Sequence, residues 1–242
     1  MSALFEELAA SATRMGELSL RRRRDPAVGV DVYEVKLDDE FLMSSLFTSA
    51  EKELARLGLA AAVGDGLRVL VGGLGLGYTA RTVLDDPRVA SVTVVDALED
   101  VIDWHRRGLL PEVAELASDP RVRLEHADFF ERVRSGRLRD AAPDGAPLDA
   151  VLVDIDHSPR HLLDASHASL YAPEGLAALA RQLAPAGVFA LWSDDPPDGP
   201  FEADLASVFA DAMSHTVRFA NPLTGGEAAN TVYVARSPRS RG

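Results

Sequence analysis

The order of apolar and polar residues changes its period along the chain. Near the start, four apolar residues recur at the spacing of one helix face: Phe5, Leu8, Ala9 and Ala12. This spacing predicts a short amphipathic helix over residues 1–15. Three extended stretches follow with turn residues between them, at residues 16–22, 29–36 and 40–44. We expect these stretches to form a small antiparallel β region, and the apolar spacing over residues 47–57 predicts a helix after it.

From residue 67 onward, short apolar runs alternate with helical patterns. The apolar runs predict strands at residues 68–71, 91–95, 122–125, 150–153 and 187–192. The helical patterns predict helices near residues 77–84, 98–106, 129–134, 174–183 and 201–212. Two final strands at residues 215–220 and 231–235 are joined by a turn sequence at residues 221–226, which predicts a hairpin. We expect residues 139–147 to form a surface loop and the tail after Arg236 to be disordered.

Strands that are apolar along most of their length are typical of a sheet covered on both faces. The alternating units and the final hairpin therefore predict an α/β protein with a Rossmann-like fold, whose seven-stranded sheet is of the class I methyltransferase type. We expect two parts. Residues 1–58 would form the N-terminal helix and small β-rich region, and residues 59–242 the Rossmann-like cofactor-binding catalytic domain.

A glycine-rich turn follows the first of these alternating strands. Gly73, Gly75 and Gly77 are separated by leucines, and glycine lets the backbone pass close to a bound adenosine. Tyr78 occupies the place of the third glycine of a dinucleotide loop, so the pattern is nearer to an S-adenosylmethionine loop than to an NAD loop. Asp96 lies 23 positions after Gly73 (96 − 73), where it can accept hydrogen bonds from ribose hydroxyls. The alternative is a tight turn that needs glycine for packing alone.

A second acidic residue follows the third predicted strand. The Asp128 carboxylate can accept a hydrogen bond from an adenine amino group, or it can cap the helix that begins at Phe129, and the two roles are compatible. The candidate cofactor-binding residues are therefore Gly73, Gly75, Leu76, Gly77, Asp96, Ala97, Asp128 and Phe129.

The candidate reaction centre follows the fourth predicted strand. Asp154, Asp156 and His157 emerge there, at the edge where open α/β sheets bind their ligands. The two carboxylates can hold a cationic amine, and one of them or His157 can accept its proton. The alternative is that the three residues cap and line a turn. These three residues are the candidate catalytic residues.

Other polar residues gather at the same edge of the predicted sheet. Asp194 and Asp195 form a second acidic cluster two and three positions after Trp192, at the end of the fifth predicted strand. His161 and His167 are six positions apart (167 − 161) and do not share a helical face. Because no third ligand accompanies them, we expect no metal site.

Composition narrows the classes of partner. The formal net charge of −13 argues against nucleic acid, whose phosphates need a basic face, and the basic run at residues 21–24 is expected to be a solvated strand end. No apolar run approaches the ~20 residues needed to cross a bilayer, and the first residues lack the pattern of a secretory signal. The absence of cysteine excludes disulfides, thiolate metal sites and a cysteine nucleophile. We expect a cytoplasmic protein with neither nucleic acid nor a membrane as partner.

From about Tyr33 to Asp195, the chain resembles the spermidine/spermine synthase (polyamine aminopropyltransferase) family. The segments that carry the resemblance are residues 35–41, 69–77, 93–101, 122–128 and 148–154. The resemblance implies a small N-terminal β domain, a Rossmann-like catalytic domain and a homodimer. It also implies that Asp96 binds the cofactor ribose, Asp128 contacts adenine and Asp154 engages the attacking amine.

Three segments differ from the family pattern. Leu76 stands where the synthases carry a loop Asp that helps to hold the aminopropyl ammonium, and an aliphatic side chain cannot offset a buried cation. The synthases also carry a Tyr-His-Glu segment on the helix before the glycine loop, where this chain has residues 50–53. After Asp154, residues 156–159 replace the Asp-Pro that is usual in the family.

We therefore expect a spermidine-synthase-like transferase that binds S-adenosylmethionine or decarboxylated S-adenosylmethionine. Its main predicted reaction is methyl or other alkyl transfer to a small-molecule acceptor such as a cationic amine. Aminopropyl transfer from the decarboxylated donor is the first alternative, and a non-catalytic regulatory protein that binds the cofactor is the second. A nucleotide-dependent oxidoreductase is the third alternative.

Overall fold

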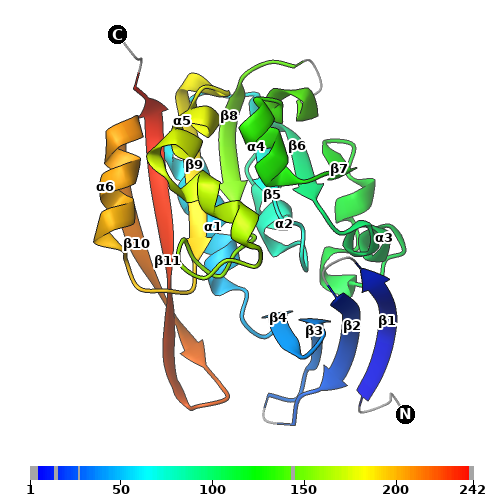
Figure 1. Cartoon of the computed structure of the whole chain (residues 1–242). Coiled ribbons are helices and arrows are strands. Elements are labelled where there is room, and N and C mark those ends of the chain that lie inside the picture. The colour runs from blue at the N-terminus through cyan, green and yellow to red at the C-terminus, as the bar shows by residue number, and fades with distance from the viewer. Residues whose placement is uncertain (1–4, 14–15, 27, 143–144, 240–242) are drawn as a thin grey trace.

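The computed structural model describes residues 5–13, 16–26, 28–142 and 145–239. In these ranges the strands form two sheets, a small antiparallel one in the order β1-β2-β3-β4 and a large mixed one in the order β10-β11-β9-β8-β5-β6-β7 (Figure 1). The small sheet lies across the end of the large sheet, below β5, β6 and β7 in the view of Figure 1. The expected α/β class, with its seven-stranded sheet and N-terminal β region, is confirmed.

The small sheet contains the one predicted helix that is wrong. Its strands are β1 (Phe5–Thr13), β2 (Gly16–Arg24), β3 (Asp31–Leu37) and β4 (Glu40–Ser44). Residues 1–4 and 14–15 of the predicted helix lie outside the described residues, and the rest is β1. Pairing with β2 overrides the helical spacing, because it places Glu6 and Glu7 opposite Arg22 and Arg21. The Arg22 guanidinium donates to Glu6 at 2.6 Å, so this part of the basic run is matched by acidic neighbours.

The large sheet confirms each strand predicted for it. Its strands are β5 (Leu67–Gly72), β6 (Val89–Asp96), β7 (Val122–His126), β8 (Leu148–Val153), β9 (Leu183–Ser193), β10 (Phe209–Asn221) and β11 (Gly226–Pro238). Strands β5 to β9 pair in parallel, whereas β11 runs antiparallel to both β9 and β10. The predicted tail is shorter than expected, because β11 continues beyond Arg236 to Pro238.

Helices cover both faces of the large sheet. They are α1 (Ser49–Ala61), α2 (Tyr78–Val83), α3 (Glu99–Arg106), α4 (Phe129–Ser135), α5 (Pro173–Ala180) and α6 (Gly199–Val208), with the short 3₁₀ turns η1 (Pro111–Val113), η2 (Leu116–Ser118), η3 (Leu138–Ala141) and η4 (Ala165–Tyr171). The predicted ends of α5 and α6 were too late, because Leu183 begins β9 and Phe209 begins β10. The predicted surface loop at residues 139–147 contains part of η3, and residues 143–144 lie outside the described residues.

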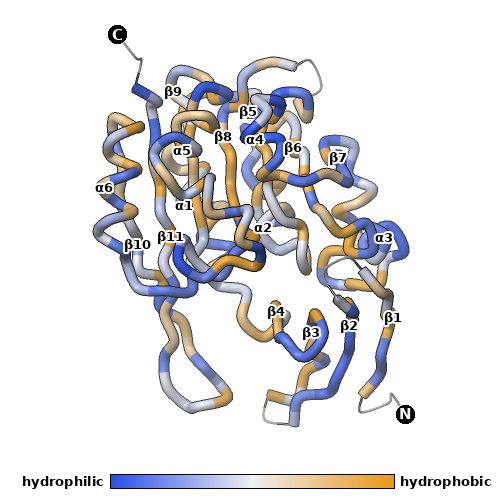
Figure 2. Tube along the Cα trace, viewed as in Figure 1, coloured by the Kyte–Doolittle hydropathy of each residue, from blue (hydrophilic) through white to orange (hydrophobic). Residues whose placement is uncertain are grey.

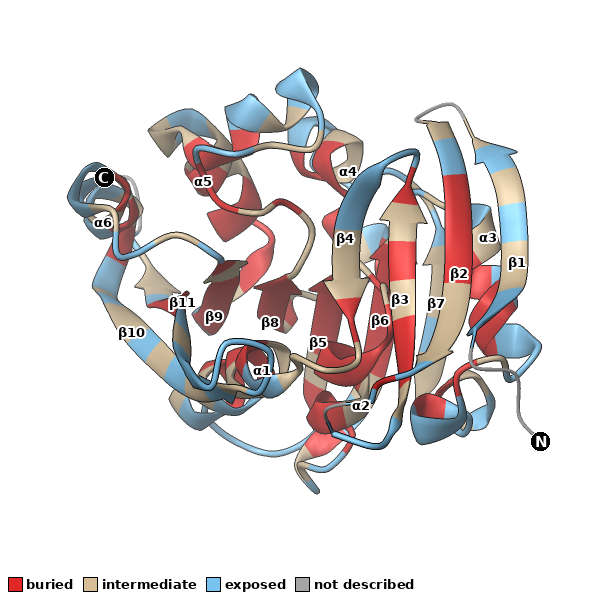
Figure 3. Ribbon diagram, turned by 90° about the horizontal axis from the view of Figure 1, so that it is seen from below, coloured by how far each residue is buried: buried red, intermediate tan, exposed pale blue. Residues whose placement is uncertain are grey.

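Two apolar clusters hold these layers together. One packs α1, α2 and α3 against one face of the large sheet and against β2 and β3 of the small sheet, and the other packs α4, α5 and α6 against the opposite face. The apolar residues accordingly follow the strands in the middle of the molecule (Figure 2), and β5, β6, β8 and β9 are buried along most of their length (Figure 3). Since α1 packs on the large sheet, the predicted domain boundary at residues 58/59 falls inside an element of that layer.

None of the helices in the described ranges is long and apolar enough to cross a membrane.

Candidate active site

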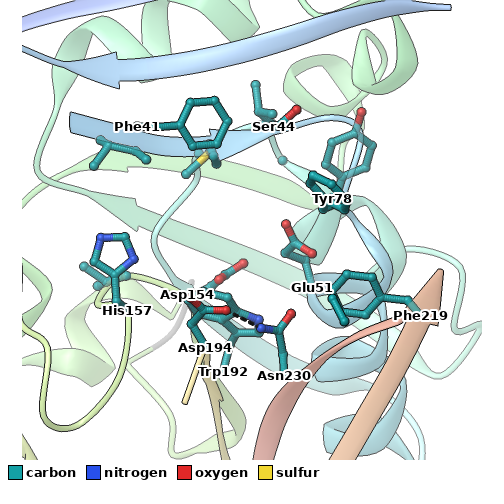
Figure 4. A pocket seen from close by; sticks show the side chains of 18 of the residues that line it. Phe41, Ser44, Glu51, Tyr78, Asp154, His157, Trp192, Asp194, Phe219 and Asn230 are labelled. Atoms are coloured by element: carbon teal, nitrogen blue, oxygen red, sulfur yellow. Dashed lines mark hydrogen bonds between the residues drawn. The ribbon is translucent and has the colours of Figure 1, made fainter. Parts of the chain in front are cut away.

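Two adjoining cavities lie at the carboxyl ends of the parallel strands, where the small sheet faces the large one. The β6 cavity, with a volume of about 380 Å³, is lined by Asp96 and Asp128 among others. The β9 cavity, with a volume of about 350 Å³, is lined by Glu51, Trp192 and other residues from β4, α1 and β11 (Figure 4). The residues common to both cavities are Leu42, Met43, Gly75, Asp154, Ile155 and Leu163. The two spaces therefore meet over the glycine loop and the end of β8.

The glycine loop has a conformation that other residues rarely adopt. Gly73, Gly75 and Gly77 have φ angles of +91°, +46° and +86°. A Cβ on Gly73 would lie 2.1 Å from the Asp154 carbonyl oxygen, and one on Gly75 would lie 2.6 Å from the Met43 sulfur. Glycine is therefore needed here both for the turn and for the close approach of neighbouring chain segments. The loop also borders both cavities, since Gly73 and Gly75 line the β6 cavity and Gly75 and Gly77 line the β9 cavity.

Asp96 lies at the end of β6 and ties the glycine loop to the next turn. Its carboxylate accepts hydrogen bonds from the backbone N–H groups of Leu74 and Leu98, each at 2.8 Å. Burial raises the pKa of Asp96 above its usual range, and the hydrogen bonds from the backbone act in the opposite direction. Its neighbour Ala97 also lines the β6 cavity. A carboxylate has about four lone-pair sites, so Asp96 can hold the loop and still accept a ribose hydroxyl.

Asp128 and Phe129, which follow the neighbouring strand β7, also line the β6 cavity. Asp128 caps α4, since its carboxylate accepts the Glu131 N–H at 2.9 Å, and it also lines the cavity. Phe129 is buried under Gly72. The next residue, Phe130, stacks on the His167 ring with centroids 3.6 Å apart, which adds a flat wall for a base. Both roles considered for Asp128 fit this arrangement, and contact with a ligand stays a prediction.

Asp154 stands where the two cavities meet. The Thr79 hydroxyl donates to its Oδ2 at 2.6 Å, and burial raises the pKa of Asp154 to about 6. A carboxylate in this position faces a ligand in either cavity.

Asp156 and His157, predicted beside Asp154 as catalytic residues, point to different places. Asp156 is 1% exposed and lines neither cavity. Its carboxylate accepts hydrogen bonds from three donors: the Leu163 N–H at 2.8 Å, the His167 ring at 2.8 Å and the Tyr171 hydroxyl at 2.7 Å. These hydrogen bonds fasten the segment of residues 157–171 to Asp156, and a catalytic role for Asp156 stays a prediction. His157 does line the β9 cavity, and its Nε2 lies 3.3 Å from a Glu40 carboxylate oxygen.

Glu51 lines the β9 cavity but is not among the candidate site residues predicted from the sequence, which named it only within the divergent residues 50–53. It lies in the first turn of α1, and its carboxylate points into the β9 cavity beside Asp154 (Figure 4). Burial, followed by the negative charge of Asp154, raises the pKa of Glu51 to about 8. One signal was present in the sequence, because Glu51 shares a helix face with the buried residues Leu54, Ala55 and Gly58. A glutamate on the buried face of a helix indicates a functional role, because burying an unpaired charge is costly.

The rest of the β9 cavity is aromatic and acidic. Among the described residues that line it there is no lysine and no arginine, whereas Glu51, Asp154 and Asp194 all contribute carboxylates. The Trp192 Nε1 atom is buried and has no hydrogen-bond partner among the described residues. The aromatic lining comes from Phe41, Phe47, Tyr78, Trp192 and Phe219. Within the described ranges no three His, Asp or Glu side chains are grouped as metal ligands.

Comparisons with known proteins agree with this architecture. Residues 50–211 match the family model described as the spermine/spermidine synthase domain. Polyamine aminopropyltransferases from Mycobacterium tuberculosis (strain ATCC 25618 / H37Rv) and Mycobacterium bovis (strain ATCC BAA-935 / AF2122/97) are each 34% identical over 140 residues. That alignment covers 57% of this chain and 25% of each relative, so the chain spans about a quarter of the length of the curated relatives it matches.

Solved structures give the same fold. A crystal structure of spermidine synthase in complex with the transition state analogue AdoDATO superposes with a TM-score of 0.73 at 19% identity, and covers 96% of this chain and 73% of that one. Spermidine synthase from Thermotoga maritima gives a TM-score of 0.70 at 18% identity, with coverage of 96% and 72%. At this level of identity the two structures establish the fold.

Proposed function

The chain belongs to the spermine/spermidine synthase family, and from this premise we propose that it transfers an aminopropyl group from decarboxylated S-adenosylmethionine to a small amine. The matched relatives are polyamine aminopropyltransferases, which supports this reaction over the methyl or other alkyl transfer that we expected from Leu76. The proposal concerns the activity of this chain itself, because it matches only part of those relatives.

The observation that carries the proposal is the charge of the β9 cavity. Its described lining residues include three carboxylates and no lysine or arginine. A donor that keeps its carboxylate would bring a further negative charge to this wall, and an unpaired buried charge is costly. A donor that has lost its carboxylate presents only an ammonium and a sulfonium, and the carboxylates stabilise both. The loop carboxylate that is missing at Leu76 is thus offset by Asp154 and Asp194, which line the same cavity.

The residues of the two cavities suggest a division of roles. We propose that the adenosine part of the donor lies in the β6 cavity, with Asp96 accepting the ribose hydroxyls and Asp128 the adenine amino group. The reacting carbon would then lie over Gly75, beside Asp154, with the acceptor amine in the β9 cavity. The bound donor supplies an activated carbon next to a positively charged sulfur. The chain itself aligns the nitrogen with that carbon and excludes water, and such positioning is worth several orders of magnitude in rate.

A second candidate reaction is methyl transfer from S-adenosylmethionine, and Leu76 is the observation that favours it. The experiment that separates the two incubates the full chain with each donor and a panel of mono-, di- and triamines, and identifies the products by mass spectrometry. We expect aminopropylated amine and methylthioadenosine from the decarboxylated donor. Methylated amine and S-adenosylhomocysteine would instead establish methyl transfer.

Calorimetry with the same donors completes this test. A sulfonium donor that binds while no amine is ever modified would support the non-catalytic alternative, and binding of NAD alone would refute the whole assignment. The matched control is Asp154→Asn, which keeps the shape of the site and should lose turnover while it still binds donor. A homodimer remains a proposal from the resemblance, which sedimentation velocity can test.

A further inference from the structure

Three elements that are distant in sequence meet where Glu51 and Asp154 line the β9 cavity. Helix α1 carries Glu51, α2 contributes Thr79, and Asp154 follows β8. The Thr79 hydroxyl lies 2.6 Å from the Asp154 carboxylate and 3.3 Å from the Glu51 carbonyl oxygen, so one side chain connects all three. Figure 4 shows the Glu51 and Asp154 carboxylates in the middle of the β9 cavity. The position of Glu51 is therefore fixed by packing.

Glu51 differs from the other carboxylates in and beside the β9 cavity in its hydrogen bonds. Each of the others has a side-chain partner: Thr79 for Asp154, Asn230 for Asp194, Tyr78 for Glu112 and His157 for Glu40. Within the part of the chain that the structure describes, the Glu51 carboxylate accepts a hydrogen bond only from its own backbone N–H. Most of its hydrogen-bonding capacity is left for a ligand.

We infer that Glu51 is a catalytic residue of the proposed transfer, the group that takes the proton from the ammonium of the acceptor, while Asp154 orients the same nitrogen. This inference rests on the proposed function. An ammonium has three donors and can bridge the two carboxylates. Asp154 already accepts the Thr79 hydroxyl, which favours its charged form, so Glu51 is the better proton acceptor.

The proton and electron balance of the step is complete. An N–H bond of the acceptor ammonium breaks, and its proton goes to a Glu51 oxygen. The lone pair left on nitrogen forms the new N–C bond, and the electron pair of the breaking C–S bond goes to sulfur, which becomes a neutral thioether. The product nitrogen is a secondary ammonium, and the proton on Glu51 passes to solvent before the next turnover. No other reactant is required.

The charged surroundings of Glu51 support this role. Burial is the largest cause of the raised pKa of Glu51, and the negative charge of Asp154 at the end of β8 raises it further. The positive charge of Lys52, on the same helix, lowers it. Tyr78 on α2 faces it, while β10 and β11 contribute the uncharged Phe219 and Asn230 to the cavity. Asp194 and His157 are the remaining titratable groups of the lining. A base whose pKa lies near neutral pH is the most effective proton acceptor.

The test compares Glu51→Gln with Glu53→Gln, a matched change on the same helix at a residue that pairs with Arg56 outside the cavity. We expect Glu51→Gln to lower kcat by about 100-fold or more, the usual contribution of a positioned base. KM for the amine and the affinity for decarboxylated donor should change far less, and Glu53→Gln should behave as wild type. The rate of Glu51→Gln should keep rising with pH as free amine accumulates, whereas the wild-type rate levels off.

Two results would overturn the assignment. One is an unchanged kcat in Glu51→Gln. The other is a loss of affinity for the decarboxylated donor with unchanged affinity for methylthioadenosine, which would mean that Glu51 holds the ammonium of the donor. Glu51→Asp separates chemistry from structure, because it should recover part of kcat only if the carboxylate takes the proton.

A failure of the proposed function can be told apart from a failure of this inference. If no amine is modified, binding of 1,4-diaminobutane is measured by calorimetry in buffers of different ionisation enthalpy. Ammonium binding should release the proton of Glu51 from the wild type and from Glu53→Gln, but not from Glu51→Gln. Equal proton release in all three proteins, or no binding of the diamine to any of them, refutes the role of Glu51.

Discussion

Replacing Asp156 should destabilise the protein more than it affects the chemical step. Its buried carboxylate accepts three hydrogen bonds, and all three donors belong to residues 163–171. Each buried donor left without a partner costs about 1–3 kcal/mol, so Asp156→Ala should lose on the order of 3–5 kcal/mol, the range for breaking a buried charged network. Asp156→Asn keeps the volume and one acceptor oxygen, and should lose roughly 1–3 kcal/mol.

The assay is urea unfolding, read alongside donor affinity and turnover at saturating substrate. Tyr171→Phe removes one of the three donors and should cost about 1–2 kcal/mol. Ser169→Ala is the control in the same segment, because this exposed residue donates one hydrogen bond to the Ser166 carbonyl oxygen at 3.4 Å and lines neither cavity, so the urea midpoint and donor affinity should hardly change. An Asp156→Asn protein with an unchanged urea midpoint and a kcat reduced at least 100-fold would refute this reasoning and restore the catalytic role.

The remaining predictions concern the glycine loop, the ribose site and the acidic pair. Gly73→Ala should lower the free energy of unfolding by about 2–5 kcal/mol in urea, because the new Cβ clashes with the backbone and a non-glycine residue is strained at positive φ. Gly64→Ala is the control: its φ is +88° and its Cβ would lie in open space, so it should show only the strain of about 1–2 kcal/mol. Asp96→Ala should weaken donor binding in calorimetry by roughly 10-fold or more, and an unchanged affinity would remove Asp96 from the donor site. The free protein should become less stable as pH rises from about 5 to about 8, because the pKa values of Glu51 and Asp154 are raised to about 8 and about 6, so the folded state holds protons that the unfolded chain has lost. The urea midpoint of Glu51→Gln should fall less than that of the wild type over this pH range. If the midpoints of the two proteins fall equally with pH, the raised pKa of Glu51 is contradicted.

The sequence predicted most of the fold because the strands of the large sheet are apolar over nearly their whole length. Its errors have local causes. The apolar stripe of α5 continues into Leu183, and residue spacing alone cannot show that the chain turns there into β9. Phe5–Thr13 has a helical spacing, but the partner that decides its structure is β2, which comes later in the chain.

The candidate site was predictable where a residue lies at the end of a parallel strand or within two positions after it. Asp96 ends β6, Asp154 directly follows β8 and Asp128 lies two positions after β7, and the carboxyl ends of parallel strands meet at one edge. That rule does not extend further along the chain. Asp156 lies two positions after Asp154 yet points into the protein, because the chain has left the strand geometry that fixes side-chain direction.

The position of Glu51 shows why similarity in one loop is a weak guide to specificity. Leu76 is 5% exposed and lines the β9 cavity, where it contributes an apolar surface in place of a charge. Carboxyl groups reach the same cavity from other elements, among them the first turn of α1, while the rest of that helix stays packed on β9. What the proposed chemistry requires is the number of carboxylates around the cation, and different elements can supply them. The substitution that weakened the aminopropyl reading of the sequence is thus compatible with that reaction once α1 is placed beside β8.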